Sequence, residues 1–238
     1  MARSIKDNGY FFQENFLSKD AAKNIFLKAK SILDSIDLSK TQEHKHFIVA
    51  NHLKSKEVKG TLHEKNKPVI VTRGLNKFDI GFVEIFNADR LIKEIPTDLI
   101  NECIRGVVSN FGISNPSIKY SIYWSDNVEQ VRGYHRDIPL SGSKFLQKLF
   151  IYLTDVPDIS YGPHSYIPKT HIGSHCARFA NQLVGNYSDP SEYDCSIDPK
   201  IFLGPPGTMV QTTQSGLHRG LPQQKGKERM VLACKIRR

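Results

Sequence analysis

Short strand-like runs fill the second half of the chain, and they restrict the possible folds more than any other feature. After Pro116, runs rich in β-branched and aromatic residues alternate with turn residues, among them Gly-Pro and Pro-Gly pairs. Seven or eight short strands at this spacing are typical of an antiparallel sandwich or barrel. The expected strands are 118–124, 131–138, 145–153, 164–167, 201–203, 208–213, 216–220 and 229–236.

The first half of the chain has the periodicity of helices. Apolar residues recur at helical spacing from Lys19 to Ile36 behind a capping Ser18, and again from Thr97 to Gly112. A shorter helix is expected over 88–94, and the polar stretch 40–75 is expected to be a loop or hairpin insert. Helices followed by strands predict an α+β fold, a jelly roll (double-stranded β-helix, cupin-like) with helices packed outside the barrel. We expect one domain over 1–238, with a helical part of about 1–115, a jelly-roll core of about 116–238, and a polar segment, 174–198, that could cover the barrel mouth.

The composition is that of an ordinary globular protein, with 39% apolar and 24% charged residues. No apolar run approaches the ~20 residues that span a bilayer, and the first residues do not resemble a signal peptide, so we expect no membrane partner and a cytoplasmic location. The four scattered cysteines are therefore expected to be free thiols. The net charge of +9 comes with no nucleic-acid-binding motif. A solvated surface around Lys40–Lys67 explains it best, followed by an anionic small-molecule substrate.

The triplet His135-Arg136-Asp137 is the first indication of chemistry. In a strand, residues i and i+2 point to the same face, so the imidazole and the carboxylate would converge while Arg136 faces away. Such a pair suits iron(II), which two histidines and one carboxylate hold with open positions. The triplet occurs once here, yet about one is expected by chance, so a surface histidine beside an aspartate is an equal alternative until a third ligand is found.

His218 and Arg229 supply that context. A polar turn separates them, and in a hairpin centred between Gln223 and Gln224 they would lie opposite each other, with Cβ atoms ~5 Å apart. A guanidinium recognises carboxylates by paired hydrogen bonds. A metal with an arginine beside it predicts a site for a dicarboxylate such as 2-oxoglutarate. A surface hairpin with a basic tip is the alternative.

Several segments in order resemble the phytanoyl-CoA dioxygenase-like family of iron(II)- and 2-oxoglutarate-dependent oxygenases. The resemblance spans most of the chain outside 40–75 and 174–198. The matching segments are Gly9-Tyr10 to Ser18, His135-Arg136-Asp137, Leu153-Thr154-Asp155-Val156, Gly162 with Ile167-Pro168-Lys169-Thr170-His171, Pro206-Gly207, and His218 with Arg229.

The resemblance implies an enzyme. Iron(II) would be bound by His135, Asp137 and His218, and Arg229 would pair with the far carboxylate of the cosubstrate 2-oxoglutarate. The implied reaction is a dioxygenase reaction with molecular oxygen, which hydroxylates a small organic substrate and releases succinate and CO2. Related halogenases lack the carboxylate, so the presence of Asp137 favours hydroxylation.

The sequence departs from the family pattern at Tyr161, where Asn is frequent, at Lys169, where Gly is usual, and at Gly220, where some members have Ser. These departures leave the other contacts to 2-oxoglutarate open. The possible contacts are Tyr120, Tyr123 and Lys148.

Two other functions remain as alternatives. One is a non-enzymatic cupin-like ligand-binding module, which would need no complete metal triad. The other is a metal-dependent isomerase on the same fold, which would need no arginine aimed at a cosubstrate. His171 and His175 have a spacing seen in zinc sites, but the family resemblance accounts for His171, so no second metal is expected.

Overall fold

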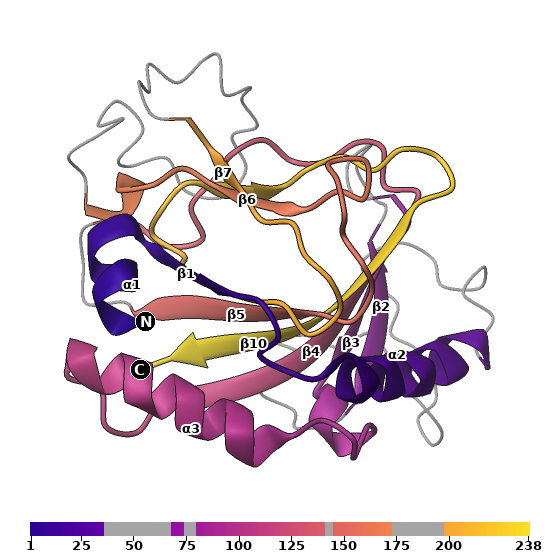
Figure 1. The fold of residues 1–238 in the computed structure, drawn as a ribbon, viewed down its shortest axis with the longest axis horizontal. Coiled ribbons are helices and arrows are strands. Elements are labelled where there is room, and N and C mark those ends of the chain that lie inside the picture. The colour runs from indigo at the N-terminus through magenta and orange to yellow at the C-terminus, as the bar shows by residue number, and fades with distance from the viewer. Residues whose placement is uncertain (36–67, 74–79, 141–144, 173–197) are drawn as a thin grey trace.

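Two antiparallel sheets form the body of the protein (Figure 1). The computed structural model describes residues 1–35, 68–73, 80–140, 145–172 and 198–238. The large sheet has seven strands in the order β1-β8-β5-β10-β4-β3-β2, and the small sheet has three in the order β7-β6-β9. The strands are β1 (Tyr10–Gln13), β2 (Val69–Arg73), β3 (Phe82–Phe86), β4 (Ser117–Asp126), β5 (Leu146–Tyr152), β6 (His164–Tyr166), β7 (Lys200–Ile201), β8 (Met209–Thr213), β9 (His218–Gly220) and β10 (Glu228–Arg237).

The helices lie mainly in the first half of the chain. They are α1 (Ala2–Asn8), α2 (Lys19–Asp34) and α3 (Thr97–Val108), with single 3-10 turns η3 (Ala88–Arg90), η4 (Ser109–Phe111) and η5 (Thr170–Ile172). The Ser18 side chain accepts a hydrogen bond from the Ala21 amide, which confirms the predicted start of α2. At the second helix, Thr97 is the first helical residue, and Pro96 rather than Thr97 precedes it as the cap.

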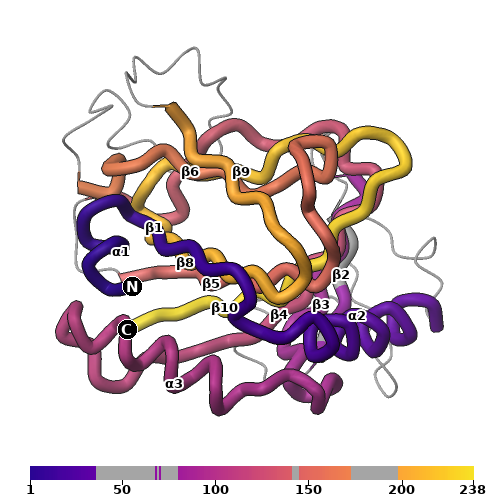
Figure 2. Tube along the Cα trace, viewed as in Figure 1, coloured from indigo at the N-terminus to yellow at the C-terminus, as the bar shows by residue number. Residues whose placement is uncertain are grey.

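The two faces of the large sheet have different roles. On β10, Met230, Leu232, Cys234 and Ile236 are buried in one core together with the apolar stripes of α2 and α3. The alternate residues point to the other face, where Val231 and Ala233 join Phe150 and Tyr152 of β5 in a second cluster. Figure 2 shows the small sheet on that second side. Side chains of both sheets, among them Tyr123 and Phe150 from the large sheet and His164 and His218 from the small one, line a cavity there.

The predicted strands are confirmed with one exception. Residues 131–138 form no strand, and only an isolated bridge joins His135 to His218. The segment instead follows a path in which Asp137 and Ile138 both donate amide hydrogen bonds to the Gln214 carbonyl. The first 115 residues also contribute more strand than expected, because β1, β2 and β3 all join the large sheet. Antiparallel sheets with few helices nevertheless agree with the predicted fold class.

Some predicted features lie outside the described residues. Among them are most of the insert 40–75, nearly all of 174–198, and the residues His44, His46, His175, Cys176 and Cys195. Cys103 and Cys234 are free thiols, as predicted. Within the described parts of the chain, no helix combines the length and apolar character that crossing a bilayer requires.

Candidate metal and cosubstrate site

His135, Asp137 and His218 converge on one point between the sheets. The Oδ1 of Asp137 lies 3.6 Å from Nε2 of His135 and 4.0 Å from Nε2 of His218. One ligand atom from each residue lies within 4.8 Å of the other two. The backbones of the two histidines exchange amide hydrogen bonds of 3.1 Å, so residues 83 positions apart in sequence are fixed side by side. The expected convergence therefore exists, although a loop rather than a strand presents Asp137.

Both imidazoles are oriented by their own backbone. The Nδ1 of His135 lies 2.9 Å from the Gly133 carbonyl, and the Nδ1 of His218 lies 3.0 Å from the Gly216 carbonyl. A carbonyl only accepts, so each Nδ1 carries the hydrogen and each Nε2 presents a lone pair toward Asp137. Burial lowers the pKa of His135, and burial lowers the pKa of His218 to about 3. Both rings are thus neutral, the state in which imidazole binds a metal.

Asp137 divides its two oxygens between different partners. Oδ1 faces the histidines, whereas Oδ2 accepts a hydrogen bond of 2.6 Å from Nζ of Lys148 on β5. Burial opposes ionisation of the carboxyl, but the charge of Lys148 and its hydrogen bond outweigh it and hold the pKa of Asp137 well below its usual range. One anionic oxygen and two imidazole nitrogens on one side of an open space fit a divalent transition metal such as iron(II).

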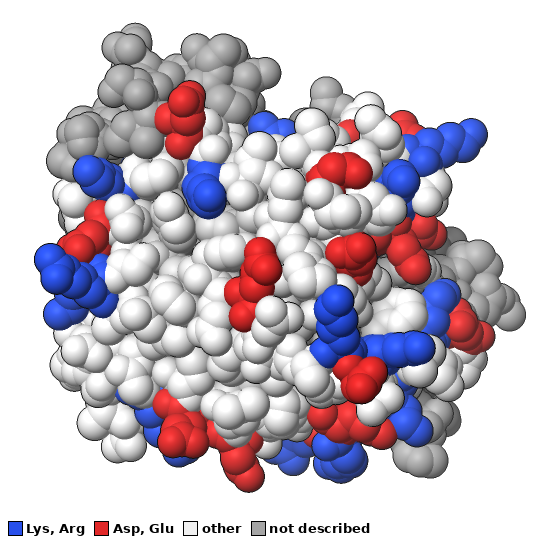
Figure 3. Space-filling model, in the orientation of Figure 1, with Lys and Arg blue, Asp and Glu red and all other residues white. Residues whose placement is uncertain are grey.

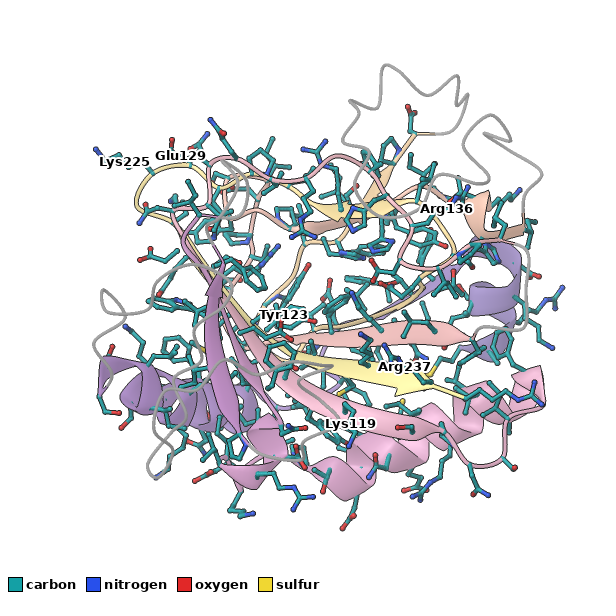
Figure 4. The ribbon with its side chains drawn as sticks, turned by 180° about the vertical axis from the view of Figure 1, so that it is seen from behind. Lys119, Tyr123, Glu129, Arg136, Lys225 and Arg237 are labelled. Atoms are coloured by element: carbon teal, nitrogen blue, oxygen red, sulfur yellow. The ribbon has the colours of Figure 1, made fainter. Side chains whose placement is uncertain are left out.

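A cavity of about 160 Å³ opens beside these ligands. Its lining includes His135 and His218, the aromatic residues Tyr123, Phe150 and Tyr152, and the basic residues Arg132, Lys148 and Arg229. Tyr123 is labelled between the sheets in Figure 4. None of the described residues that line the cavity is Asp or Glu. The cavity is therefore suited to a small anionic ligand.

Arg229 reaches the cavity by a different route from the one expected. Strand β9 pairs with β6, whereas β10 pairs with β4 and β5, so His218 and Arg229 lie in different sheets and not opposite each other in a hairpin. The intervening turn crosses between the sheets, where Gln223 donates its amide hydrogen to the Val128 carbonyl and pairs with Tyr161. The two predicted residues still line the same cavity.

The guanidinium of Arg229 has a donor that lacks an acceptor. Its Nε is buried and forms no hydrogen bond within the described parts of the chain. Burial lowers the pKa of Arg229, and the neighbouring Tyr152 opposes that shift. A buried cationic donor without a partner is costly unless a ligand supplies the acceptor. A carboxylate of a bound acid would do so.

Of the three further contacts considered, two line the cavity and one does not. Tyr123 and Lys148 belong to its lining. Tyr120 lies on the opposite face of β4, where its hydroxyl donates to Oδ1 of Asn101 on α3 at 2.7 Å. Alternation along β4 explains this, since 120 and 123 differ by an odd number of residues.

His164, which the sequence places next to the family-like Gly162 and which was considered as a residue near the pocket, lines the cavity. It lies on β6, its ring is stacked with Phe202 and tilted against Phe150, and its centroid is 5.8 Å from that of His218. Its Nε2 is buried and has no hydrogen-bond partner among the described residues, and burial holds the pKa of His164 well below the usual value. Only its place directly after Gly162-Pro163 in the family-like segment could have indicated its position.

His171 and Arg136 have structural roles. The Nε2 of His171 lies 2.9 Å from the Lys6 carbonyl, so this ring joins η5 to α1. Arg136 is buried and donates hydrogen bonds to the carbonyls of Thr170 and Ser215. Within the described ranges, His135, Asp137 and His218 are the one grouping of three or more His, Cys, Asp or Glu residues that could hold a metal.

Comparisons with known proteins identify the fold. No protein-family model and no curated protein matches the sequence. Among solved structures, the chain is similar to the non-heme alpha ketoglutarate dependent carbocyclase SnoK from nogalamycin biosynthesis (TM-score 0.65, 15% identity, 99% of this chain and 82% of SnoK). It is also similar to the epimerase SnoN from the same biosynthesis (0.65, 10%, 99% and 81%). A third match is EvdO2 from Micromonospora carbonacea var. aurantiaca complexed with 2-oxoglutarate (0.60, 10%, 99% and 89%). Identities this low establish a shared fold.

Proposed function

We propose that the chain is an iron(II)- and 2-oxoglutarate-dependent oxygenase that acts on a small organic substrate. The observation that carries this proposal is a cavity lined by His135, His218 and Arg229, beside which Asp137 places one carboxylate oxygen within 4.0 Å of the Nε2 atoms of both histidines. A non-enzymatic ligand-binding module would have no use for three oriented metal ligands. A metal-dependent isomerase would have no use for an arginine in the cavity whose buried Nε lacks an acceptor.

Each residue has a defined task in this proposal. His135, Asp137 and His218 would hold iron(II) from one side and leave its cavity side open. Arg229 would bind the far carboxylate of 2-oxoglutarate and so aim its keto acid end at the metal. The bound iron would couple oxidation of the second substrate by molecular oxygen to conversion of 2-oxoglutarate into succinate and CO2. The apolar walls from Phe150 and Val231 would keep water from the reacting groups.

The proposal extends to the fold and the family. The two antiparallel sheets around the site would be the two sides of a double-stranded β-helix, within one oxygenase domain over 1–238. The order of the sequence motifs supports membership of the phytanoyl-CoA dioxygenase-like family. The similarity to SnoK, SnoN and EvdO2 supports the wider class, since one solved structure of SnoN contains Fe3+ and alpha ketoglutarate.

Hydroxylation is the reaction we propose, because Asp137 occupies the position that a halide needs in related halogenases. Epimerisation or ring closure is a second candidate, and the similarity to an epimerase and a carbocyclase favours it. The two outcomes differ in the fate of oxygen. A hydroxylated product carries one atom from ¹⁸O₂, whereas an epimerised or cyclised product carries none.

The direct test is iron-dependent turnover of 2-oxoglutarate by the purified protein, read as succinate. We expect His135→Ala to abolish both iron binding and succinate formation. Arg229→Gln should keep iron binding and weaken 2-oxoglutarate binding on the order of a hundredfold, as expected when one partner of a buried charge pair is removed. Arg105→Gln, an equal charge change on the exposed surface of α3, is the matched control. A wild-type protein that binds neither iron nor 2-oxoglutarate would refute the proposal.

A further inference from the structure

His164 and Arg229 line the cavity from different sheets. His164 lies on β6 of the small sheet, and Arg229 lies on β10 of the large one. In the register of the small sheet, His164 is paired directly with Gly220 on β9. Directly paired residues point to one face, with Cβ positions ~5 Å apart. Gly220 also lines the cavity, so this face of the small sheet is the one that borders it.

Gly220 leaves the space beside His164 open toward Arg229. A Cβ atom on Gly220 would lie 3.7 Å from Nη2 of Arg229. Apart from the chain neighbours of Gly220, no other heavy atom of the described residues would lie within 4 Å of it. The guanidinium therefore faces Gly220, and the imidazole starts from the directly paired position on the same face. An acidic group placed over Gly220 can contact both side chains.

Both side chains have a buried polar atom without a partner. The Nε2 of His164 and the Nε of Arg229 form no hydrogen bond within the described chain. His164 is only 9% exposed, and its ring centroid lies 4.9 Å from that of Phe150 and 5.9 Å from that of Phe202. A buried polar group without a partner costs about 1–3 kcal/mol. A ligand that bonds to both side chains would offset this cost.

Other polar side chains of the cavity lining are engaged by the protein itself. Lys148 donates a hydrogen bond of 2.6 Å to Asp137. The hydroxyl of Tyr152 donates a hydrogen bond of 2.7 Å to the Phe202 carbonyl. These donors already have acceptors, whereas the imidazole of His164 remains available to a ligand.

The charge around His164 and Arg229 favours an acid as that ligand. None of the described residues that line the cavity is Asp or Glu, so no carboxylate of the lining competes for these two side chains. On the outer face shown in Figure 3, by contrast, Lys and Arg side chains are interspersed with Asp and Glu side chains. A carboxylate is therefore better matched by the cavity than by the surface in this view.

We propose that the imidazole of His164 donates a hydrogen bond to the far carboxylate of 2-oxoglutarate, the group that Arg229 binds in the proposed function. A neutral imidazole carries one N–H donor, and the two oxygens of a carboxylate accept from several donors at once. The guanidinium supplies the charge, and the imidazole fixes the rotation of the carboxylate between the two sheets. This inference rests on the proposed function, because it assigns His164 to the cosubstrate which that function requires.

Two keto acids of equal chain length separate this contact from the others. 2-Oxopentanoate ends in a methyl group where 2-oxoglutarate has its far carboxylate. In calorimetric titrations of the iron(II) protein without oxygen, His164→Phe should bind 2-oxoglutarate about tenfold more weakly than the wild type does, the loss of one hydrogen bond to a charged group. Its binding of 2-oxopentanoate should equal that of the wild type. Equal losses for both acids, or no loss for either, would overturn the proposal.

His164→Asn and His164→Gln each place an amide donor near the position of one ring nitrogen. At least one of the two should bind 2-oxoglutarate more tightly than His164→Phe does, and failure of both to do so would overturn the proposal. His171→Phe is the matched control, because His171 joins η5 to α1 and is not among the residues that line the cavity. It should leave the binding of both keto acids unchanged.

A double variant tests whether His164 and Arg229 hold the same group. In an Arg229→Gln background, His164→Phe should weaken 2-oxoglutarate binding less than it does in the wild type, because residues that share one partner are coupled. Additive losses would overturn the proposal. Iron(II) affinity should be the same in wild type and His164→Phe. A loss of iron(II) binding in His164→Phe would assign the ring to support of His218 and would also overturn it.

The failure of this inference differs from the failure of the proposed function. If the wild type binds neither iron nor 2-oxoglutarate, the proposed function fails and the inference with it. If the wild type binds both and forms succinate, but His164→Phe binds 2-oxoglutarate as tightly as the wild type does, the inference alone fails.

Discussion

The Nζ of Lys148 lies 2.6 Å from Oδ2 of Asp137, on the side of the carboxylate that faces away from His135 and His218. The lysine holds one oxygen and leaves Oδ1 as the single oxygen presented to a metal. Lys148 is therefore a positioning residue, and we predict that Lys148→Met weakens iron(II) binding about tenfold to a hundredfold, the range typical of residues that orient a metal ligand. Calorimetric titration with iron(II) or cobalt(II) under anaerobic conditions measures this change.

Lys148→Arg is the companion variant, because a guanidinium can donate to the same oxygen. It should restore most of the affinity, and the absorption spectrum of the cobalt(II) protein should return toward that of the wild type. Equal affinity in wild type and Lys148→Met would show that Asp137 needs no such support.

We predict that His164 lowers the stability of the protein but contributes to binding of 2-oxoglutarate. Its Nε2 is buried without a partner in the described structure, which costs about 1–3 kcal/mol. We predict that His164→Phe, which keeps a ring between Phe150 and Phe202, melts at a higher temperature than the wild type but binds 2-oxoglutarate more weakly. Thermal melting and 2-oxoglutarate titration are compared on the same samples. A variant that melts lower and binds 2-oxoglutarate equally well would place His164 in packing alone.

Arg136 connects the two segments that carry the metal ligands. Its Nη1 donates to the Thr170 carbonyl at 2.6 Å and also to the Ser215 carbonyl, three residues before His218. Arg136→Met should lower the free energy of unfolding by about 2–4 kcal/mol, because buried carbonyls lose their donor. Urea denaturation measures the loss. A surface substitution such as Arg105→Met should change stability by less than about 0.5 kcal/mol, and an equal effect of both variants would contradict this role.

The sequence was sufficient to predict that His135, Asp137 and His218 lie together, because this depends on local order and chemistry. His135 and Asp137 are two residues apart, and the strong β pattern of residues 208–236 brings His218 and Arg229 into one region. The predicted hairpin between His218 and Arg229 does not form, because the turn between them crosses from the small sheet to the large one. No periodicity in residues 221–227 indicates that crossing.

The pairing of Lys235 with both Lys119 and Lys148 could not be predicted, for a different reason. Each lysine alone fits an ordinary strand with alternating polar and apolar residues. Their juxtaposition requires the pairing of β10 with both β4 and β5, strands that start more than 80 residues earlier in the chain. Register over such distances is set by the packing of the whole sheet, and a shift of one residue would have placed Lys235 in the helix-covered core.

Lys235 predicts a particular dependence of stability on pH. Burial and the neighbouring cations lower its pKa from 10.5 to about 8 in the folded protein. Between these values the unfolded chain binds more protons than the folded chain, so stability rises with pH, and the penalty of the charged lysine is fully present below pH 8. We predict that Lys235→Met is more stable than the wild type by about 1–2 kcal/mol at pH 7, after allowance for solvent screening. This advantage should shrink toward zero near pH 10.5, where the wild-type lysine is neutral in both states.

Urea denaturation at several pH values between 7 and 10.5, with Lys225→Met, which removes an exposed lysine, as the control, gives the difference directly. A difference that does not change with pH, or a wild type more stable than the variant at pH 7, would contradict this prediction.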